Sequence, residues 1–268
     1  MQGEMNMKEI LVHGSTLPSA YHQALQQLKM YGERADCADW NTTQIEVSMT
    51  MVVEYPLEEP MISRLFIGGP KELEQYKQEL LDGILDFEIE KGNWVYTYHD
   101  RMVNYPIYDA KHEMYSFNQV NFVIDELKRN PSSRRAVILV RDPSIDAFSD
   151  DPACLQHVQF LIRDDKLHCK VLFRSNDACK ATFMNAFGLI MLQKRIADEL
   201  GLEVGTYTHR ANSFHCYEKD IPMLEGYYKT MCEKTHEECT YDYVDGWDEL
   251  MEEYKEDIAA EVEELRTH

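Results

Sequence analysis

The chain has 268 residues, 44% of them hydrophobic, and a formal net charge of −21, a size that suits one large domain or two small ones. The acidic balance argues against a nucleic-acid groove, although a few arginines in a pocket can still bind a small phosphate. Because the sequence has neither an 18-residue apolar run nor a signal-peptide pattern at its start, it predicts a cytoplasmic protein that does not span a membrane.

The first third of the chain predicts a helix, a strand and a second helix. Residues 19–31 carry apolar side chains at helical spacing, and residues 44–54 alternate as a strand does. A helix over 71–83 follows Pro70 and ends at Gly83.

A third helix is predicted over residues 116–130. Val120, Val123 and Leu127 recur at the spacing of one helix face. Ser116 is the predicted N-terminal cap, and Pro131 stops the helix.

The second half mixes strands and helices without strict alternation. Residues 134–140 predict a buried strand, and residues 158–163 and 166–173 predict a hairpin whose turn is Asp164–Asp165. A helix over 185–200 closed by Gly201, a strand over 204–215 and a helix over 218–232 follow. This order predicts an α+β fold in a single domain.

Residues 233–268 form an acidic end of the chain. By count they hold fourteen acidic residues against Lys234, Lys255 and Arg266, which predicts a solvated helix. The predicted organisation is therefore a catalytic domain over 1–232 and an acidic, helical extension over 233–268.

The cysteines predict one nucleophile and no metal site. Seven cysteines without paired spacing favour free thiols in a reducing compartment. Cys154 is the candidate nucleophile, because Arg174 lies across the predicted hairpin and a nearby cation favours a thiolate. Cys232, His236 and Cys239 lack a fourth ligand nearby, so we predict no metal site there.

Arginines supply candidate phosphate ligands. Arg134 and Arg135 precede the apolar strand, and a guanidinium binds phosphate oxygens in a bidentate manner. Neighbouring side chains on a strand point to opposite faces, so only one of the two reaches a given ligand unless the strand end bends.

Several motifs share one register around Cys154. Relative to Cys154, Arg134 lies at −20, Arg174 at +20, Asn185 at +31 and His215 at +61. The motifs are YTYHDRM at 96–102, QVNFVIDELKRNPSSRRAVI at 119–138, DPACLQ at 151–156, FRSND at 173–177, FMNAF at 183–187 and SFHCY at 213–217. Over residues 94–220 the chain resembles the thymidylate synthase family, in particular its shorter archaeal and phage branch and the related pyrimidine nucleotide hydroxymethylases.

The resemblance implies a fold and an assembly. The expected fold has three layers, with a mixed sheet that packs against helices and also forms the interface of a homodimer. The implied substrate is a pyrimidine nucleoside monophosphate, with dUMP expected, and the implied cofactor is 5,10-methylenetetrahydrofolate.

The resemblance also implies catalytic roles. Cys154 would add to C6 of the pyrimidine, so that C5 becomes nucleophilic, and Tyr98 would assist proton transfer at C5. Asn185 would read O4 and N3 of the ring, where an amide suits uracil and an acidic residue would suit cytosine. Glu79 is the candidate for the glutamate that organises water and protons near the ring.

The remaining implied residues bind substrate and cofactor. Arg174 and Ser175 would hold the 5′-phosphate, and Arg174 would help to keep Cys154 ionised. Arg134 and Arg135 would reach the same phosphate from the second subunit, and Arg34 is a candidate for a further phosphate ligand. The substrate-binding set is Arg134, Arg135, Arg174, Ser175, Asn176, Asn185, His215 and Tyr217, with the last two on the sugar 3′-hydroxyl. Asp177 would face the pterin of the folate.

The acidic end of the chain leaves the reaction outcome open. The short apolar C-terminus that closes over folate in standard thymidylate synthases is absent. Because exclusion of water decides between methylation and hydroxymethylation, the two outcomes are near even. Methylation of dUMP to dTMP is favoured slightly, and a dUMP, CMP or dCMP 5-hydroxymethylase is the alternative. Ala153 and Leu155, on either side of the nucleophile, differ from the residues usual in the family. An inactive binding or regulatory homologue is therefore a remote third alternative.

Overall fold

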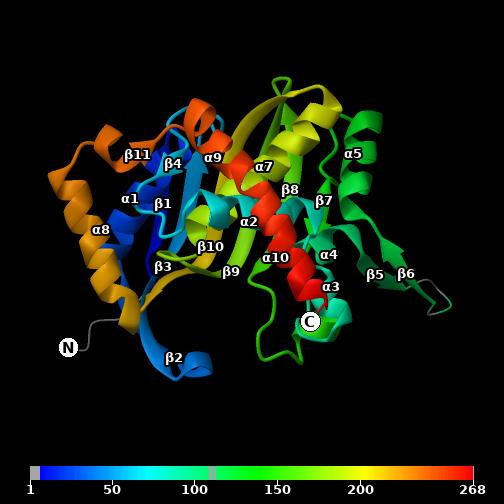
Figure 1. Ribbon diagram of the computed structural model, residues 1–268, viewed down its shortest axis with the longest axis horizontal. Helices are drawn as coiled ribbons and strands as arrows, with labels where there is room; N and C mark the ends of the chain where they lie inside the picture. The colour runs from blue at the N-terminus through cyan, green and yellow to red at the C-terminus, as the bar shows by residue number, and fades with distance from the viewer. Residues whose placement is uncertain (1–6, 109–110, 112, 268) are drawn as a thin grey trace.

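A computed structural model describes residues 7–108, 111 and 113–267. Its main element is a mixed sheet in the order β1-β3-β10-β9-β8-β7, with β2 paired to β3 (Figure 1). Two short sheets pair β4 with β11 and β5 with β6. The strands are β1 Glu9–Gly14, β2 Glu33–Cys37, β3 Thr42–Val53, β4 Ile62–Ser63, β5 Tyr105–Tyr108, β6 Met114–Phe117, β7 Val137–Leu139, β8 Leu155–Arg163, β9 Lys166–Asp177, β10 Glu203–Tyr217 and β11 Thr240–Tyr241.

Helices cover one face of the main sheet in two layers. Helices α1 and α7 pack directly on the strands, α2 packs on α7, and α9 and α10 pack on α2 (Figure 1). The mixed sheet and its helical layers confirm the predicted α+β class. The helices are α1 Leu17–Tyr31, α2 Pro70–Asp82, α3 Phe87–Glu90, α4 Tyr98–Val103, α5 Gln119–Arg129, α6 Pro143–Asp146, α7 Thr182–Leu200, α8 Ile221–Glu233, α9 Asp248–Glu253 and α10 Lys255–Thr267, with short 3₁₀ turns at 38–40, 218–220 and 237–239 and a π turn at 243–247.

Local sequence signals explain the ends of the main elements. Pro70 occupies the first turn of α2, where its missing N–H costs nothing, and Gly83 ends the helix in the left-handed conformation with φ 65°. Gly201 ends α7 in the same way. Asp164 and Asp165, both at positive φ, form the two-residue turn of the β8–β9 hairpin.

One predicted cap is wrong. Ser116 lies in β6, and its hydroxyl group donates to Asn104, so it does not begin a helix. Helix α5 starts three residues later, where the side chain of Asn118 accepts from the backbone N–H of Asn121 at 2.9 Å. The segment before Asn118 is taken into a hairpin with β5.

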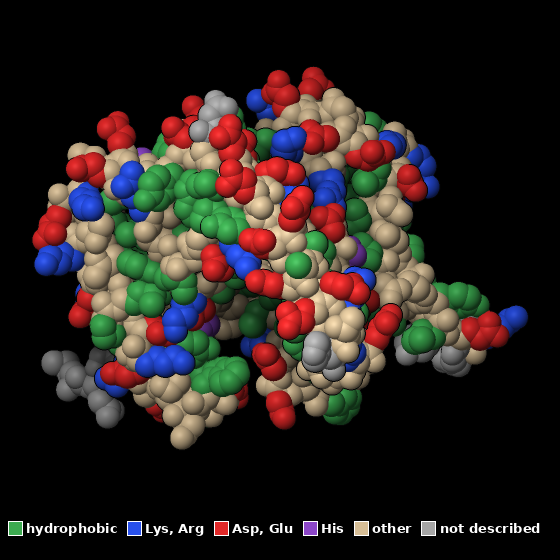
Figure 2. Space-filling model, in the orientation of Figure 1, with side chains coloured by type: hydrophobic (Ala, Val, Ile, Leu, Met, Phe, Trp, Pro, Cys, Tyr) green, Lys and Arg blue, Asp and Glu red, His purple; other side chains and the backbone are tan. Residues whose placement is uncertain are grey.

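The acidic C-terminal segment folds onto the rest of the chain. Thr240 and Tyr241 pair with β4, and Met251 and Ile258 each bury all but 1% of their surface. Helix α10 packs on α2, and Lys71 on α2 forms a 2.6 Å ion pair with Glu261. Figure 2 shows acidic side chains gathered over this helix beside a hollow in the same face. The outer face of the segment is acidic while its inner face is apolar.

Three further features concern the cysteines, the helix lengths and the metal-ligating side chains. All seven cysteines are free thiols, and no helix among the described residues is both long and apolar enough to cross a membrane. Within the described ranges, no group of three or more His, Cys, Asp or Glu side chains could hold a metal ion.

Candidate active site

Cys154 lies directly before β8 and is held from β9. The backbone N–H of Arg174 donates to the Cys154 carbonyl at 2.8 Å, and the Arg174 guanidinium donates to the carbonyls of Pro152 at 2.7 Å and Ala153 at 3.2 Å. Burial raises the pKa of the Cys154 thiol above its ordinary value, and the positive charge of Arg174 acts in the opposite direction. The hairpin therefore brings the predicted nucleophile and the predicted cation together.

Tyr98 stands beside the nucleophile. Its hydroxyl oxygen accepts from the backbone N–H of Leu155 at 3.3 Å, and its ring lies 5.9 Å from that of Tyr96. Burial raises the pKa of Tyr98 well above its ordinary value, so the phenol stays protonated and can donate.

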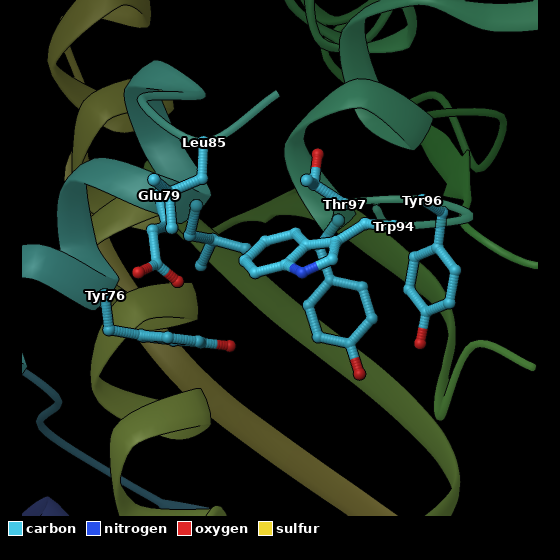
Figure 3. A pocket seen from close by; sticks show the side chains of 8 residues that line it. Tyr76, Glu79, Leu85, Trp94, Tyr96 and Thr97 are labelled. Carbon is cyan, nitrogen blue, oxygen red and sulfur yellow. The ribbon is translucent and has the colours of Figure 1, made fainter. Parts of the chain in front are cut away.

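A pocket with aromatic walls opens next to Tyr98. It is lined by Tyr76, Glu79, Leu80, Leu85, Trp94, Tyr96, Thr97 and Tyr98, and its empty volume is about 420 Å³. Figure 3 shows Tyr76 and Glu79 on one side, Tyr96 on the other, and the Trp94 indole reaching between them. Burial raises the pKa of Glu79, and Gln75 donates to its carboxylate at 2.8 Å. The pocket therefore offers flat apolar walls and one carboxyl group whose pKa lies above its ordinary value.

Asn185 is held at the back of this region by two side chains. Its Nδ2 donates to the hydroxyl group of Tyr76 at 2.5 Å, and its Oδ1 accepts from Nδ2 of Asn176 at 2.9 Å. An amide oxygen accepts two hydrogen bonds and an amide NH₂ donates two. The oxygen and the NH₂ of Asn185 can therefore each make one further hydrogen bond. Asn176 itself is 4% exposed and lies behind Asn185.

His215 and Tyr217 lie together at the end of β10. Their rings meet edge to face at 4.7 Å, and Nδ1 of His215 is 3.3 Å from the hydroxyl group of Ser175 on the parallel strand β9. Nε2 of His215 is buried and has no hydrogen-bond partner among the described residues. Burial lowers the pKa of His215 and raises that of Tyr217 to about 12, so both side chains are neutral hydrogen-bonding groups.

Asp177 closes the turn that leads into α7. Its Oδ1 accepts from the backbone N–H groups of Cys179 and Lys180, both at 2.9 Å. This leaves Oδ2 without a hydrogen-bond partner among the described residues. Asp177 on β9 is the register partner of His215 on β10, so it lies at the same end of these strands as Ser175, His215 and Tyr217.

The fold of the single chain does not bring Arg134 and Arg135 to Cys154. Both are exposed, and Gln159 donates to the Arg134 carbonyl at 3.1 Å, far along β8 from the nucleophile. Five residues of extended strand separate Gln159 from Cys154, roughly 16 Å. Arg34 is paired with Glu218 at 2.7 Å, so its guanidinium already has an anionic partner.

Three aromatic residues of the site, Tyr76, Trp94 and Tyr96, were given no role from the sequence. Tyr76 lies one turn before Glu79 on α2, and that spacing places both on one helix face. Trp94 lies two residues before the YTYHDRM motif and Tyr96 is its first residue, both in a stretch without strand or helix. Two aromatic residues close to Tyr98 in sequence were the available signal for the second wall of the pocket.

Comparisons with known proteins show what this chain is similar to. The family model described as thymidylate synthase matches residues 68–243. A Methanocaldococcus jannaschii protein with a provisional thymidylate synthase name is 35% identical over 225 residues, which cover 80% of this chain and 93% of the relative. A Methanosarcina barkeri protein with the same name is 30% identical, over 82% of this chain and 94% of its own. The solved thermostable thymidylate synthase A from Bacillus subtilis shares the fold, with a TM-score of 0.61 over 80% of this chain and 84% of that one, at 18% identity.

Proposed function

This chain belongs to the thymidylate synthase family, whose enzymes carry out folate-dependent one-carbon transfer, and we propose that it converts dUMP to dTMP through a covalent adduct on Cys154. One observation carries the proposal. Cys154 lies beside the Arg174 guanidinium and the Tyr98 hydroxyl group, and Asn185 is hydrogen-bonded to Tyr76. Tyr98 and Tyr76 line the same pocket, so the nucleophile and the amide lie on one site. A nucleophile, a cation and an amide that reads a ring are the groups this chemistry needs.

Cys154 acts as the nucleophile. The sulfur forms a bond to C6 of the uracil ring, and the π electrons of the C5–C6 bond move toward C5 and O4, so that C5 becomes nucleophilic. The free thiol is mainly protonated near neutral pH, because its pKa is raised by burial. The charge of Arg174 favours the thiolate, and Tyr98 is placed to move protons at C5.

Asn185 reads the ring. Its Nδ2 donates to O4, where negative charge develops during addition, and its Oδ1 accepts from N3–H. Tyr76 and Asn176 hold the amide in place, so little reorganisation is needed when the charge appears.

Arg174 and Ser175 hold the 5′-phosphate, and His215 and Tyr217 hold the sugar. A guanidinium has five N–H donors. Two donors of Arg174 reach carbonyls of the protein, which leaves three for phosphate oxygens. The unpartnered Nε2 of His215 suits a sugar hydroxyl group. Fixing both ends of the nucleotide makes the attack effectively intramolecular.

A second subunit supplies Arg134 and Arg135. Within one protomer these arginines lie far from Cys154, so they reach the phosphate only from a partner. The face of the sheet opposite α1 and α7 carries Leu139, Leu161 and Leu172, which alternate with buried neighbours along their strands. We assign this face to a homodimer interface. The free thiols suit the reducing cytoplasm.

Methylenetetrahydrofolate fits the aromatic pocket. Tyr96 and Trp94 offer flat surfaces for a pterin, and Glu79 offers a carboxyl group with a raised pKa. Asp177 does not line this pocket, and its Oδ2 offers an acceptor for pterin nitrogens from β9. When bound, the folate supplies the one-carbon unit. The protein's part is to position the two rings and to control water.

Hydroxymethylation of the same nucleotide is the second candidate. Among the described residues, none from α9 or α10 lines the aromatic pocket, because these helices pack on the outer side of α2. Without a C-terminal segment over the pocket, water can reach the one-carbon group on C5 of the pyrimidine.

Product analysis tests the proposal. Protein is incubated with dUMP and methylenetetrahydrofolate, and nucleotides and folates are identified by mass spectrometry. The synthase forms dTMP with dihydrofolate, whereas the hydroxymethylase forms hydroxymethyl-dUMP with tetrahydrofolate. A wild-type protein that binds dUMP and forms neither product is the inactive homologue, and the proposal is then wrong.

A further inference from the structure

A buried chain of hydrogen bonds runs behind the candidate ring reader, Asn185. It starts on β10, crosses β9 and ends on α2, through Tyr207, His209, Asn176, Asn185 and Tyr76. The Tyr207 hydroxyl group lies 2.9 Å from Nδ1 of His209, and Nε2 of His209 lies 2.9 Å from Oδ1 of Asn176. Asn176 and Asn185 are joined at 2.9 Å, and Asn185 and Tyr76 at 2.5 Å.

Each link in this chain determines the direction of the next. Burial lowers the pKa of His209 to about 3, so the ring is neutral and has one N–H donor and one acceptor nitrogen. If Tyr207 donates to Nδ1, then Nε2–H donates to Asn176, whose NH₂ donates to Asn185, whose NH₂ donates to Tyr76. If Tyr207 accepts instead, every amide in the chain is reversed.

Burial of Tyr207 selects the first direction. Tyr207 is fully buried, and its hydroxyl group has no other hydrogen-bond partner among the described residues. In the reversed direction its O–H proton would be left unpaired in the core, which is costly. Thr182 is compatible with the first direction but does not select it, because its hydroxyl group lies 2.8 Å from Oδ1 of Asn176 and 2.9 Å from the Asp177 carbonyl and can donate to either.

The direction of the chain determines which base Asn185 can pair with. Uracil needs a donor toward O4 and an acceptor for N3–H, whereas cytosine needs an acceptor for its amino group and a donor toward N3. If the amide of Asn185 is reversed in the same place, its donor and acceptor change positions and it matches cytosine instead of uracil. The selected direction puts the donor NH₂ of Asn185 on the Tyr76 side and the acceptor oxygen on the Asn176 side.

We propose that Tyr207, His209 and Asn176 are positioning residues that lock the amide of Asn185 in the uracil-reading direction and so exclude cytosine nucleotides. This inference rests on the proposed function. None of the three touches the nucleotide, and each acts through the next. Asn176, expected from the resemblance to bind substrate, takes the role of a link in this chain.

The test compares Tyr207→Phe with Tyr21→Phe. Tyr21 is the matched control, because it is also fully buried and its hydroxyl group donates to the Ala178 carbonyl outside the chain. Dissociation constants for dUMP and dCMP are measured by calorimetry. The wild type and Y21F should bind dUMP more tightly than dCMP. In Y207F the ratio of the dCMP to the dUMP dissociation constant should fall about five- to 150-fold, the range expected for one unpaired buried polar group.

The tautomer of His209 gives an independent readout in the wild-type protein. Nitrogen NMR shifts, assigned by their loss in His209→Gln, should show a proton on Nε2 and none on Nδ1. The opposite tautomer overturns the inference even if Y207F does not fold.

The outcomes separate this inference from the proposed function. A wild type that prefers dUMP, with an unchanged preference in a folded Y207F, overturns only the positioning role. A wild type that prefers dCMP overturns the assigned direction. A wild type that binds neither nucleotide overturns the proposed function and this inference with it.

Discussion

The C-terminal helix α10 should contribute to the stability of the whole domain through Ile258. This side chain is 1% exposed, on a helix that packs against α2. Helix α2 in turn supplies Tyr76 and Glu79 to the candidate site. Replacing Ile258 with alanine therefore tests whether the acidic segment is part of the cooperative fold or an independent, solvated helix.

The size of the effect follows from burial. Ile258→Ala removes three buried carbon atoms, worth about 2.4 kcal/mol at roughly 0.8 kcal/mol each, and the remaining cavity brings the expected loss to about 2–4 kcal/mol. The ion pair between Lys71 and Glu261 is partly exposed, with side-chain exposures of 29% and 55%, so solvent screening leaves its contribution to stability small. The apolar contact should dominate the docking of α10.

Urea denaturation measures the change in the free energy of unfolding. Leu265→Ala is the control on the same helix, because Leu265 is 50% exposed and should cost less than about 0.5 kcal/mol. A single transition destabilised in I258A alone is the expected result. If I258A unfolds like the wild type, or shows a separate early transition, α10 is not part of the cooperative unit.

Three further predictions concern the nucleophile, the ring reader and a buried histidine. Alkylation of Cys154 should accelerate with rising pH, because its pKa is raised, and Arg174→Gln should shift that profile to higher pH; an unshifted profile, as expected for the exposed control Arg163→Gln, would contradict the role of Arg174. Asn185→Asp should reduce kcat/KM for dUMP at least about tenfold and raise it for dCMP, because a carboxylate cannot donate to O4; steady-state kinetics with unchanged selectivity would rule this out. Burial lowers the pKa of His22 from 6.5 to about 4, so its folded-state value lies below the unfolded one, and its contribution is present above pH 6.5 and is lost as the pH falls toward 4. That loss amounts to at most about 3 kcal/mol, and denaturation of His22→Gln should show a shallower fall over this window; equal slopes would refute it.

The features predicted best are those that repeat locally. The helical spacing in residues 19–31, the Pro70 and Gly83 boundaries and the Asp164–Asp165 turn each depend on neighbours in the sequence, and the structure has them in place. Cys154 and Arg174 could be paired in advance because they lie on adjacent strands of one hairpin. Family membership was predicted from the register of several motifs and is confirmed by the family model.

The features that were missed depend on distant parts of the chain. Strand β1 has only Ile10, Leu11 and Val12 as an apolar run and becomes a strand through parallel pairing with β3. Ser116 has the chemistry of a cap, but pairing with β5 takes it into a strand. The position of Asn176 behind Asn185 depends on His209, 33 residues away, so no local pattern shows it.

Tritium release from [5-³H]dUMP is the most direct test of the central claim, because both candidate reactions replace the hydrogen at C5 after addition of Cys154 at C6. With methylenetetrahydrofolate present, the wild-type protein should release tritium to water, and a folded Cys154→Ala variant should release none above background. Full release by Cys154→Ala, or no release by a wild type that binds dUMP, would contradict covalent one-carbon transfer at this site.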